Sequence, residues 1–152
     1  MFTTPIILMQ DLQTIIRDTA KLIREAHRQI PGPEFGAEYS RLVDRMFLGG
    51  YAETFEKIHA GDGSAVEFGL VFVEIRPYFF RSQYLRTRLI RMLKQARLGS
   101  LHAERLKRIL DLEHDKKTKS KEAKWKILIH EAVHTQKRKG KTHAKLARAV
   151  PP

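Results

Sequence analysis

The sequence predicts an all-α protein, a single-domain bundle or short helical stack of six to seven helices with a basic, flexible C-terminal tail. Apolar residues recur three and four positions apart in successive segments, which is the period of an amphipathic helix. Glycine and proline separate these segments at short intervals, so consecutive helices are expected to pack as neighbours. Residues 70–75 also suit a buried strand, but no second stretch of the chain offers that strand a partner.

Three helices are expected in the first part of the chain. The first is an amphipathic helix of about 20 residues after Pro5, a residue type that suits the first turn of a helix. The second covers residues 37–48, and the third is short and begins at Tyr51. Each of them is followed by helix-breaking residues, at positions 31–33, 49–50 and 61–63.

The stretch 64–75 has almost no polar face, so we expect it to form the helix at the centre of the core. Ser64 and Glu67 fit a capping box, in which each side chain bonds the free backbone N–H of the other residue. Phe72 is expected to be fully buried on this helix. The helix is expected to end before Pro77, because the residue that precedes a proline avoids the helical region.

The next predicted helix covers about residues 82–96, and its polar side is almost entirely arginine and lysine. After Gly99 a sixth helix is expected over residues 101–110. The lysine-rich run 115–124 predicts a loop or a frayed helix start. A last helix is expected from Trp125, with an apolar stripe along one side.

Length and charge set the domain organisation. The chain has 152 residues, which suits one domain, and we expect a helical domain over residues 1–135. Residues 136–152 have little apolar surface to bury and are expected to form a basic, disordered tail. The formal net charge is +12. Residues 1–75 hold 7 Lys/Arg and 11 Asp/Glu, whereas residues 76–152 hold 22 and 6, so the basic second half is expected to face an anionic partner.

The chain has no cysteine, which excludes disulfides and thiolate metal sites. Its first residues have no basic segment followed by a long apolar run, so they do not predict a signal peptide. No apolar run approaches the roughly 20 residues of a membrane span. The expectation is a cytoplasmic protein without a membrane partner.

The segment 74–84 is dense in aromatic residues and arginine. It resembles an uncharacterised family of small bacterial proteins with a Pro-aromatic-Phe-Phe-Arg-Ser-Gly-Tyr motif, over roughly residues 64–112. The residues that match in kind are Pro77, Tyr78, Phe79, Phe80, Arg81, Ser82 and Tyr84. The resemblance implies a small helical protein and brings no known activity with it. Gln83 stands where the family has glycine, so the resemblance does not imply a turn that needs glycine at this position.

Two interpretations of this motif remain open. In the structural one, Phe79 and Phe80 enter the core, and Arg81 bonds the exposed carbonyl groups at the end of the preceding helix. In the functional one, bases of a nucleic acid stack on Tyr78 or Tyr84, with Arg81 beside them.

The arginine-rich helix and the tail supply the candidate nucleic-acid-binding residues, because guanidinium groups donate two parallel hydrogen bonds to a phosphate. These residues are Arg81, Arg86, Arg88, Arg91, Lys94, Arg97, Lys137, Arg138, Lys139 and Lys141. The alternative is a solvated helix face that pairs with the acidic first half of the chain. Its carboxylates would come from Glu34, Glu38, Asp44, Glu53, Glu56 and Asp62.

The pattern His130-Glu131-Ala132-Val133-His134 resembles the zinc site of zincin metallopeptidases. Histidines at i and i+4 share a helix face and bind zinc together, with the glutamate as general base. No acidic residue follows Glu131 in the chain, so a downstream glutamate ligand is absent. The apolar stripe that begins at Trp125 also points away from both histidines. Zinc is therefore the alternative cofactor, and the leading expectation is none.

We therefore expect a non-enzymatic binding module whose basic half engages an anionic partner, with nucleic acid first. The alternatives are a zinc hydrolase that uses the His-Glu-x-x-His motif, and an adaptor that binds an acidic protein.

Overall fold

The computed structural model describes the backbone of residues 5–147 and the side chains of residues 10–135, 137 and 138. All regular secondary structure in this part of the chain is α-helix, so the all-α prediction is confirmed and the strand alternative for residues 70–75 is wrong. The helices are α1 (Pro5–Gln29), α2 (Gly32–Met46), α3 (Tyr51–Ala60), α4 (Gly63–Ile75), α5 (Ser82–Gln95) and α6 (Ser100–Ala147).

The chain divides into two compact units, residues 1–109 and residues 110–152. The first unit contains α1 to α5 and the start of α6, and the second contains the remainder of α6. The division falls at Ile109, whereas the sequence predicted a helical domain that continues to residue 135.

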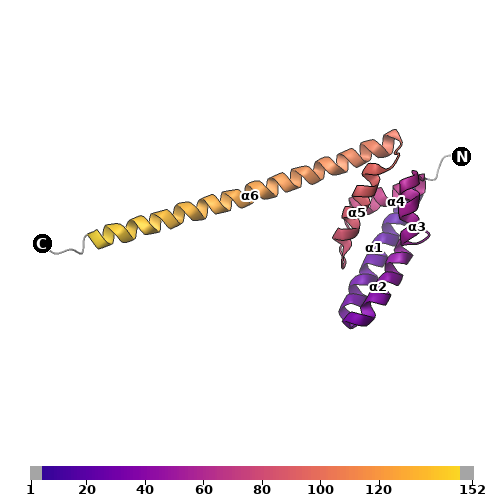
Figure 1. Cartoon of the computed structure of the whole chain (residues 1–152), viewed down its shortest axis with the longest axis horizontal. Coiled ribbons are helices and arrows are strands. Elements are labelled where there is room, and N and C mark those ends of the chain that lie inside the picture. Colours follow the sequence, from indigo (N-terminus) through magenta and orange to yellow (C-terminus); the bar gives the residue numbers. More distant parts are fainter. Residues whose placement is uncertain (1–4, 148–152) are drawn as a thin grey trace. The chain divides into compact units, whose positions relative to one another are not determined.

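Helix α4 is the centre of the first unit. It contacts α1, α3 and α5, while α1 and α2 run side by side (Figure 1). Every residue from Phe68 to Val73 is buried, and Phe72 has no exposed surface, as the sequence predicted. Gly69 brings the neighbouring helices close, because a Cβ atom built on it would lie 3.3 Å from Ile58 of α3 and 3.4 Å from Leu93 of α5.

The two ends of α4 are held by residues other than those expected. Asp62 is the N-cap, and its side chain accepts a hydrogen bond from Ala65 N at 3.0 Å. The predicted Ser64–Glu67 capping box is therefore wrong, and Glu67 binds Arg105 of α6 at 2.6 Å instead. At the other end, Arg86 Nε of α5 donates to the carbonyl oxygen of Val73 at 3.2 Å, so a buried arginine binds a terminal carbonyl of the helix.

The α4–α5 connector, residues 76–81, turns sharply without glycine. Arg76 (φ 53°) and Arg81 (φ 60°) adopt the left-handed conformation, which costs a non-glycine residue on the order of 1–2 kcal/mol. Gln83 lies inside the first turn of α5. The connector therefore needs no glycine at position 83, where the family that this segment resembles has one.

Helix α2 begins five residues earlier than predicted, because Pro33 lies in its first turn, where a proline has no backbone hydrogen bond to lose. Helix α6 is continuous through residues 115–124, where we expected a loop or a frayed start. Its sequence has neither glycine nor proline from Ser100 to Lys139, and most of its lysine, glutamate, alanine and leucine residues favour the helix. The backbone stays helical to Ala147, beyond the start of the expected tail, and residues 148–152 lie outside the described chain.

None of the helices in the described chain combines the length and the apolar character that crossing a bilayer requires.

Candidate functional site

Arginines from α1 and from the α4–α5 connector line one surface hollow of about 560 Å³. Arg24 and Arg28 are one turn apart on α1, and Arg81 lies at the start of α5. Arg24 Nη1 donates to the carbonyl oxygen of Tyr78 at 2.7 Å, which fastens the connector to α1. The residues that line the hollow include no carboxylate; they are Arg24, His27, Arg28, Tyr78, Phe79, Phe80 and Arg81.

A second hollow, of about 290 Å³, shares Tyr78, Phe79 and Arg81 with the first. Its lining again includes no carboxylate, and it adds Arg76 and Arg86 from the connector and from α5. Because the two hollows share these residues, they form one cationic surface. We call it the arginine junction and define it by Arg24, Arg28, Arg76, Tyr78 and Arg81.

Aromatic packing fixes the arginine junction to the core. Phe79 is buried, as predicted, and its ring lies 6.3 Å from that of Phe72. Phe80 was also expected in the core, but it is 39% exposed and packs its ring 5.0 Å from His27 and 5.5 Å from Phe35. Tyr78 is 81% exposed, so the core does not use its ring.

Arg81 takes no part in an ion pair with any described residue. Its guanidinium carbon lies 5.3 Å from the centroid of the Phe80 ring, a cation–π contact that leaves the hydrogen-bond donors available. The expectation that Arg81 binds the carbonyls at the end of α4 is replaced by the Arg86 contact with Val73.

The structure separates the predicted binding residues of α5 into three kinds. Arg86 is buried, and desolvation, followed by the nearby charge of Arg76, lowers the pKa of its guanidinium. Arg86 borders the second hollow, but its buried side chain binds the end of α4, and we therefore leave it out of the arginine junction. Arg88 Nη1 donates to the hydroxyl oxygen of Tyr51 at 2.6 Å, and its guanidinium lies 4.6 Å from the Phe55 ring centroid, so Arg88 joins α5 to α3. The exposed cations with no ion pair to a described residue are Arg91, Lys94 and Arg97.

Several of the carboxylates that the alternative assigned to these cations have local roles. Glu38 binds Arg41 at 2.6 Å and Glu53 binds Lys57 at 2.7 Å, each within its own helix. Asp44 Oδ1 accepts a hydrogen bond from Tyr51 N at 2.7 Å. Since Asp62 caps α4, four of the six carboxylates that the alternative required are engaged away from α5.

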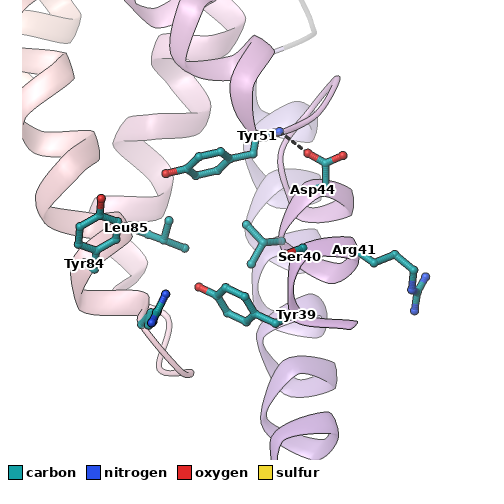
Figure 2. A pocket seen from close by; sticks show the side chains of 9 residues that line it. Tyr39, Ser40, Arg41, Asp44, Tyr51, Tyr84 and Leu85 are labelled. Carbon is teal, nitrogen blue, oxygen red and sulfur yellow. Dashed lines mark hydrogen bonds between the residues drawn. The ribbon is translucent and has the colours of Figure 1, made fainter. Parts of the chain in front are cut away.

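A third hollow, of about 460 Å³, opens between α2, the start of α3 and the start of α5. We call it the tyrosine cleft. Figure 2 shows the hydroxyl groups of Tyr39 and Tyr51 directed toward the side where Tyr84 lies. Burial raises the pKa of Tyr39. The cleft is lined by Tyr39, Ser40, Arg41, Val43, Asp44, Tyr51, Arg81, Tyr84 and Leu85.

The rings of His130 and His134 lie with their centroids 4.4 Å apart on an exposed part of α6. Within the described residues, no group of three or more His, Asp or Glu side chains is placed to hold a metal ion. A catalytic zinc takes three protein ligands, and these two histidines with Glu131 as base supply two of them. The side chain of His143 lies outside the described part.

Of the predicted tail residues, Lys137 and Arg138 are exposed on α6, and the side chains of Lys139 and Lys141 lie outside the described part. The sequence interpretation missed Arg24 and Arg28, because it assigned binding to the basic second half of the chain. The available signal was their spacing of four on α1, which places both on one helix face.

No family model matches this chain, and no curated protein or solved structure gives a match to it. The resemblance of residues 64–112 to the family with the Phe-Phe-Arg-Ser motif stays a prediction.

Proposed function

We propose that this protein binds nucleic acid through the phosphate groups, which it contacts at the arginine junction. The observation that carries the proposal is that Arg24 and Arg28 of α1 meet Arg81 at one hollow whose lining includes no carboxylate. More than fifty residues separate the two segments, and the Arg24–Tyr78 hydrogen bond joins them. The fold therefore gathers positive charge from both halves of the chain.

Arginine suits phosphate because its planar guanidinium donates two parallel hydrogen bonds to the oxygens. Arg91 and Lys94 on α5, and Arg97 just after its C-cap, extend the exposed positive charge of the first unit. Each phosphate that such side chains neutralise releases counterions, which makes affinity depend steeply on salt. Lys137 and Arg138 add positive charge on the second unit, and such charge attracts phosphates whatever the base sequence.

The conformation of Arg81 supports a functional role. A glycine would adopt its left-handed backbone at lower cost, and yet the chain has an arginine there whose guanidinium has no carboxylate partner among the described residues. Strained residues of this kind concentrate at binding sites, where the required side chain outweighs the backbone cost.

The test is the salt dependence of binding to a fluorescently labelled oligonucleotide, followed by anisotropy. We expect log affinity to fall linearly with log salt, and the Arg28→Gln/Arg81→Gln double variant to reduce the slope by about 1.4–1.8, the sum for two lost phosphate contacts. Arg45→Gln is the matched control, because Arg45 is also exposed but borders a different hollow, beside Leu22 and Glu25. It should change the slope much less.

Two results would contradict the proposal. One is the absence of binding to DNA and RNA at physiological salt, which would favour an acidic protein as the partner. The other is an equal loss of slope in the double variant and in two control substitutions elsewhere, which would mean that only net charge matters.

A further inference from the structure

The tyrosine cleft borders the arginine junction, and Arg81 lines both. The ionic groups of the cleft other than Arg81 are already engaged. Arg41 binds Glu38 and points away from the cleft in Figure 2, and Asp44 accepts the hydrogen bond from Tyr51 N. The oxygen of the Tyr51 hydroxyl accepts a hydrogen bond from Arg88 Nη1 at 2.6 Å, which leaves its proton to be donated. What remains for a ligand is Arg81, the rings of Tyr39 and Tyr84, and the hydroxyl proton of Tyr51.

The three tyrosine rings come from different helices and line the same cleft. Tyr39 belongs to α2 and Tyr51 to the first turn of α3, and both direct their hydroxyl groups toward the α5 side. Leu85 points from α5 toward the cleft in Figure 2, and Tyr84 lines the cleft from the same helix. Tyr84 is 63% exposed, so packing within the chain does not account for its ring.

This chemistry suits an uncharged, flat ring with polar edges. Aromatic side chains stack on the face of such a ring, and phenol hydroxyls donate to and accept from its edge. The volume of about 460 Å³ lies in the range of roughly 300–1,000 Å³ that is usual for small-molecule sites. A nucleobase has these properties.

We infer that the tyrosine cleft receives an unstacked base of a single-stranded nucleic acid whose phosphates lie on the arginine junction. The inference rests on the proposed function and adds the class of nucleic acid. Arg81 lies where the two surfaces meet, so a phosphate bound there leaves the attached base beside the cleft. A duplex is excluded from this arrangement, because its bases are paired and stacked on one another.

The decisive probe is a pair of labelled strands of equal length, an oligothymidylate and a strand of abasic sugar-phosphate units. The two carry the same phosphate charge, and only the first has bases. We expect the full-length protein to bind the abasic strand at least about fivefold more weakly, since base–aromatic stacking contributes on the order of that factor or more per base. A duplex of equal length carries twice the phosphate charge, so its test is the cleft variant below, whose binding to the duplex should equal that of the wild type.

Variants assign the effect to the cleft. Tyr84→Ala should weaken binding to oligothymidylate about fivefold or more and leave binding to the abasic strand unchanged. Tyr84→Phe keeps the ring and should retain most of the affinity. Because Tyr84 is exposed, both variants should keep the thermal transition of the wild type.

The outcomes separate this inference from the proposed function. If the abasic strand binds as tightly as oligothymidylate, or if Tyr84→Ala binds oligothymidylate like the wild type, the base cleft is wrong. In that case the phosphate site stands, provided that the Arg28→Gln/Arg81→Gln variant still loses salt dependence. If no strand binds at physiological salt, both ideas are wrong.

Discussion

Both units contain helices with an apolar stripe along one side, but the stripes are buried in the first unit and exposed in the second. In the first unit, the apolar stripes of α1 to α5 are buried where these helices pack on one another, with α4 against α1, α3 and α5. In the second, the stripe that includes Trp125, Leu128 and Ile129 is exposed, with Trp125 at 65%. The comparison shows that periodicity identifies the face of a helix that would be buried, whereas burial itself requires a neighbouring helix.

The largest expected difference between the units is in the effect of removing one aromatic side chain. Phe72→Ala should lower the free energy of unfolding by about 3–5 kcal/mol, because it leaves a cavity in a packed core. Trp125→Ala should change that free energy by less than about 0.5 kcal/mol, since the indole is exposed. Urea unfolding followed by far-ultraviolet circular dichroism measures both. Similar losses in the two variants would mean that Trp125 is covered in solution.

An intermediate effect is expected where α6 joins the first unit. Arg105 forms hydrogen bonds of 2.6–2.7 Å to Glu67 and Glu74 of α4, and its side chain is only 17% exposed. Arg105→Gln leaves Glu74 without this partner and Glu67 with only the His102 ring at 3.1 Å, and it should destabilise the protein by about 1–3 kcal/mol. Arg108→Gln is the matched control, because Arg108 is exposed on the same helix. Equal thermal midpoints for the two variants would show that the contact with α4 contributes nothing to stability.

The smallest expected effect has the opposite sign. Arg81→Gly removes the cost of a left-handed arginine, and it should raise the free energy of unfolding by up to about 1 kcal/mol. The same variant should bind oligonucleotides more weakly, because it loses the guanidinium at the arginine junction. Thermal unfolding and anisotropy titration on one preparation measure the two effects. A variant that is less stable would show that the contact between Arg81 and the Phe80 ring outweighs the backbone strain.

The sequence predicted the helices of the first unit well, because each has an amphipathic pattern and a strong breaker after it. Most of its errors at the site concern interactions between residues far apart in the chain. From the sequence, Arg86 is expected on the surface of α5 like its neighbouring arginines. It is buried because α5 packs against the end of α4, where Arg86 donates a hydrogen bond to the carbonyl oxygen of Val73. One error is local: Asp62 caps α4 in place of Ser64, because an aspartate is also a strong N-cap and lies two residues earlier in the chain.

The candidate site was predicted in part. Tyr78, Arg81 and Tyr84 were identified from the motif, but their partners Arg24 and Arg28 lie on α1 in the acidic half of the chain. We counted the net charge over each half of the chain, and the first half is acidic as a whole. Such a count does not show that two of its arginines lie together on one surface. The tyrosine cleft could not be predicted from the sequence either, because its rings come from three helices and no local sequence pattern shows that these helices meet.

The distribution of the fluorescent side chains gives each unit its own spectroscopic label. The one tryptophan of the chain, Trp125, belongs to the second unit, and all four tyrosines, at positions 39, 51, 78 and 84, belong to the first. Excitation at the red edge of the absorption band, where only indole absorbs, therefore reports on α6 beyond Ile109 and is silent about the core. Tyrosine signals in near-ultraviolet circular dichroism report on the helices around α4. The melting of the two units is thus separable in the natural protein, without any introduced dye.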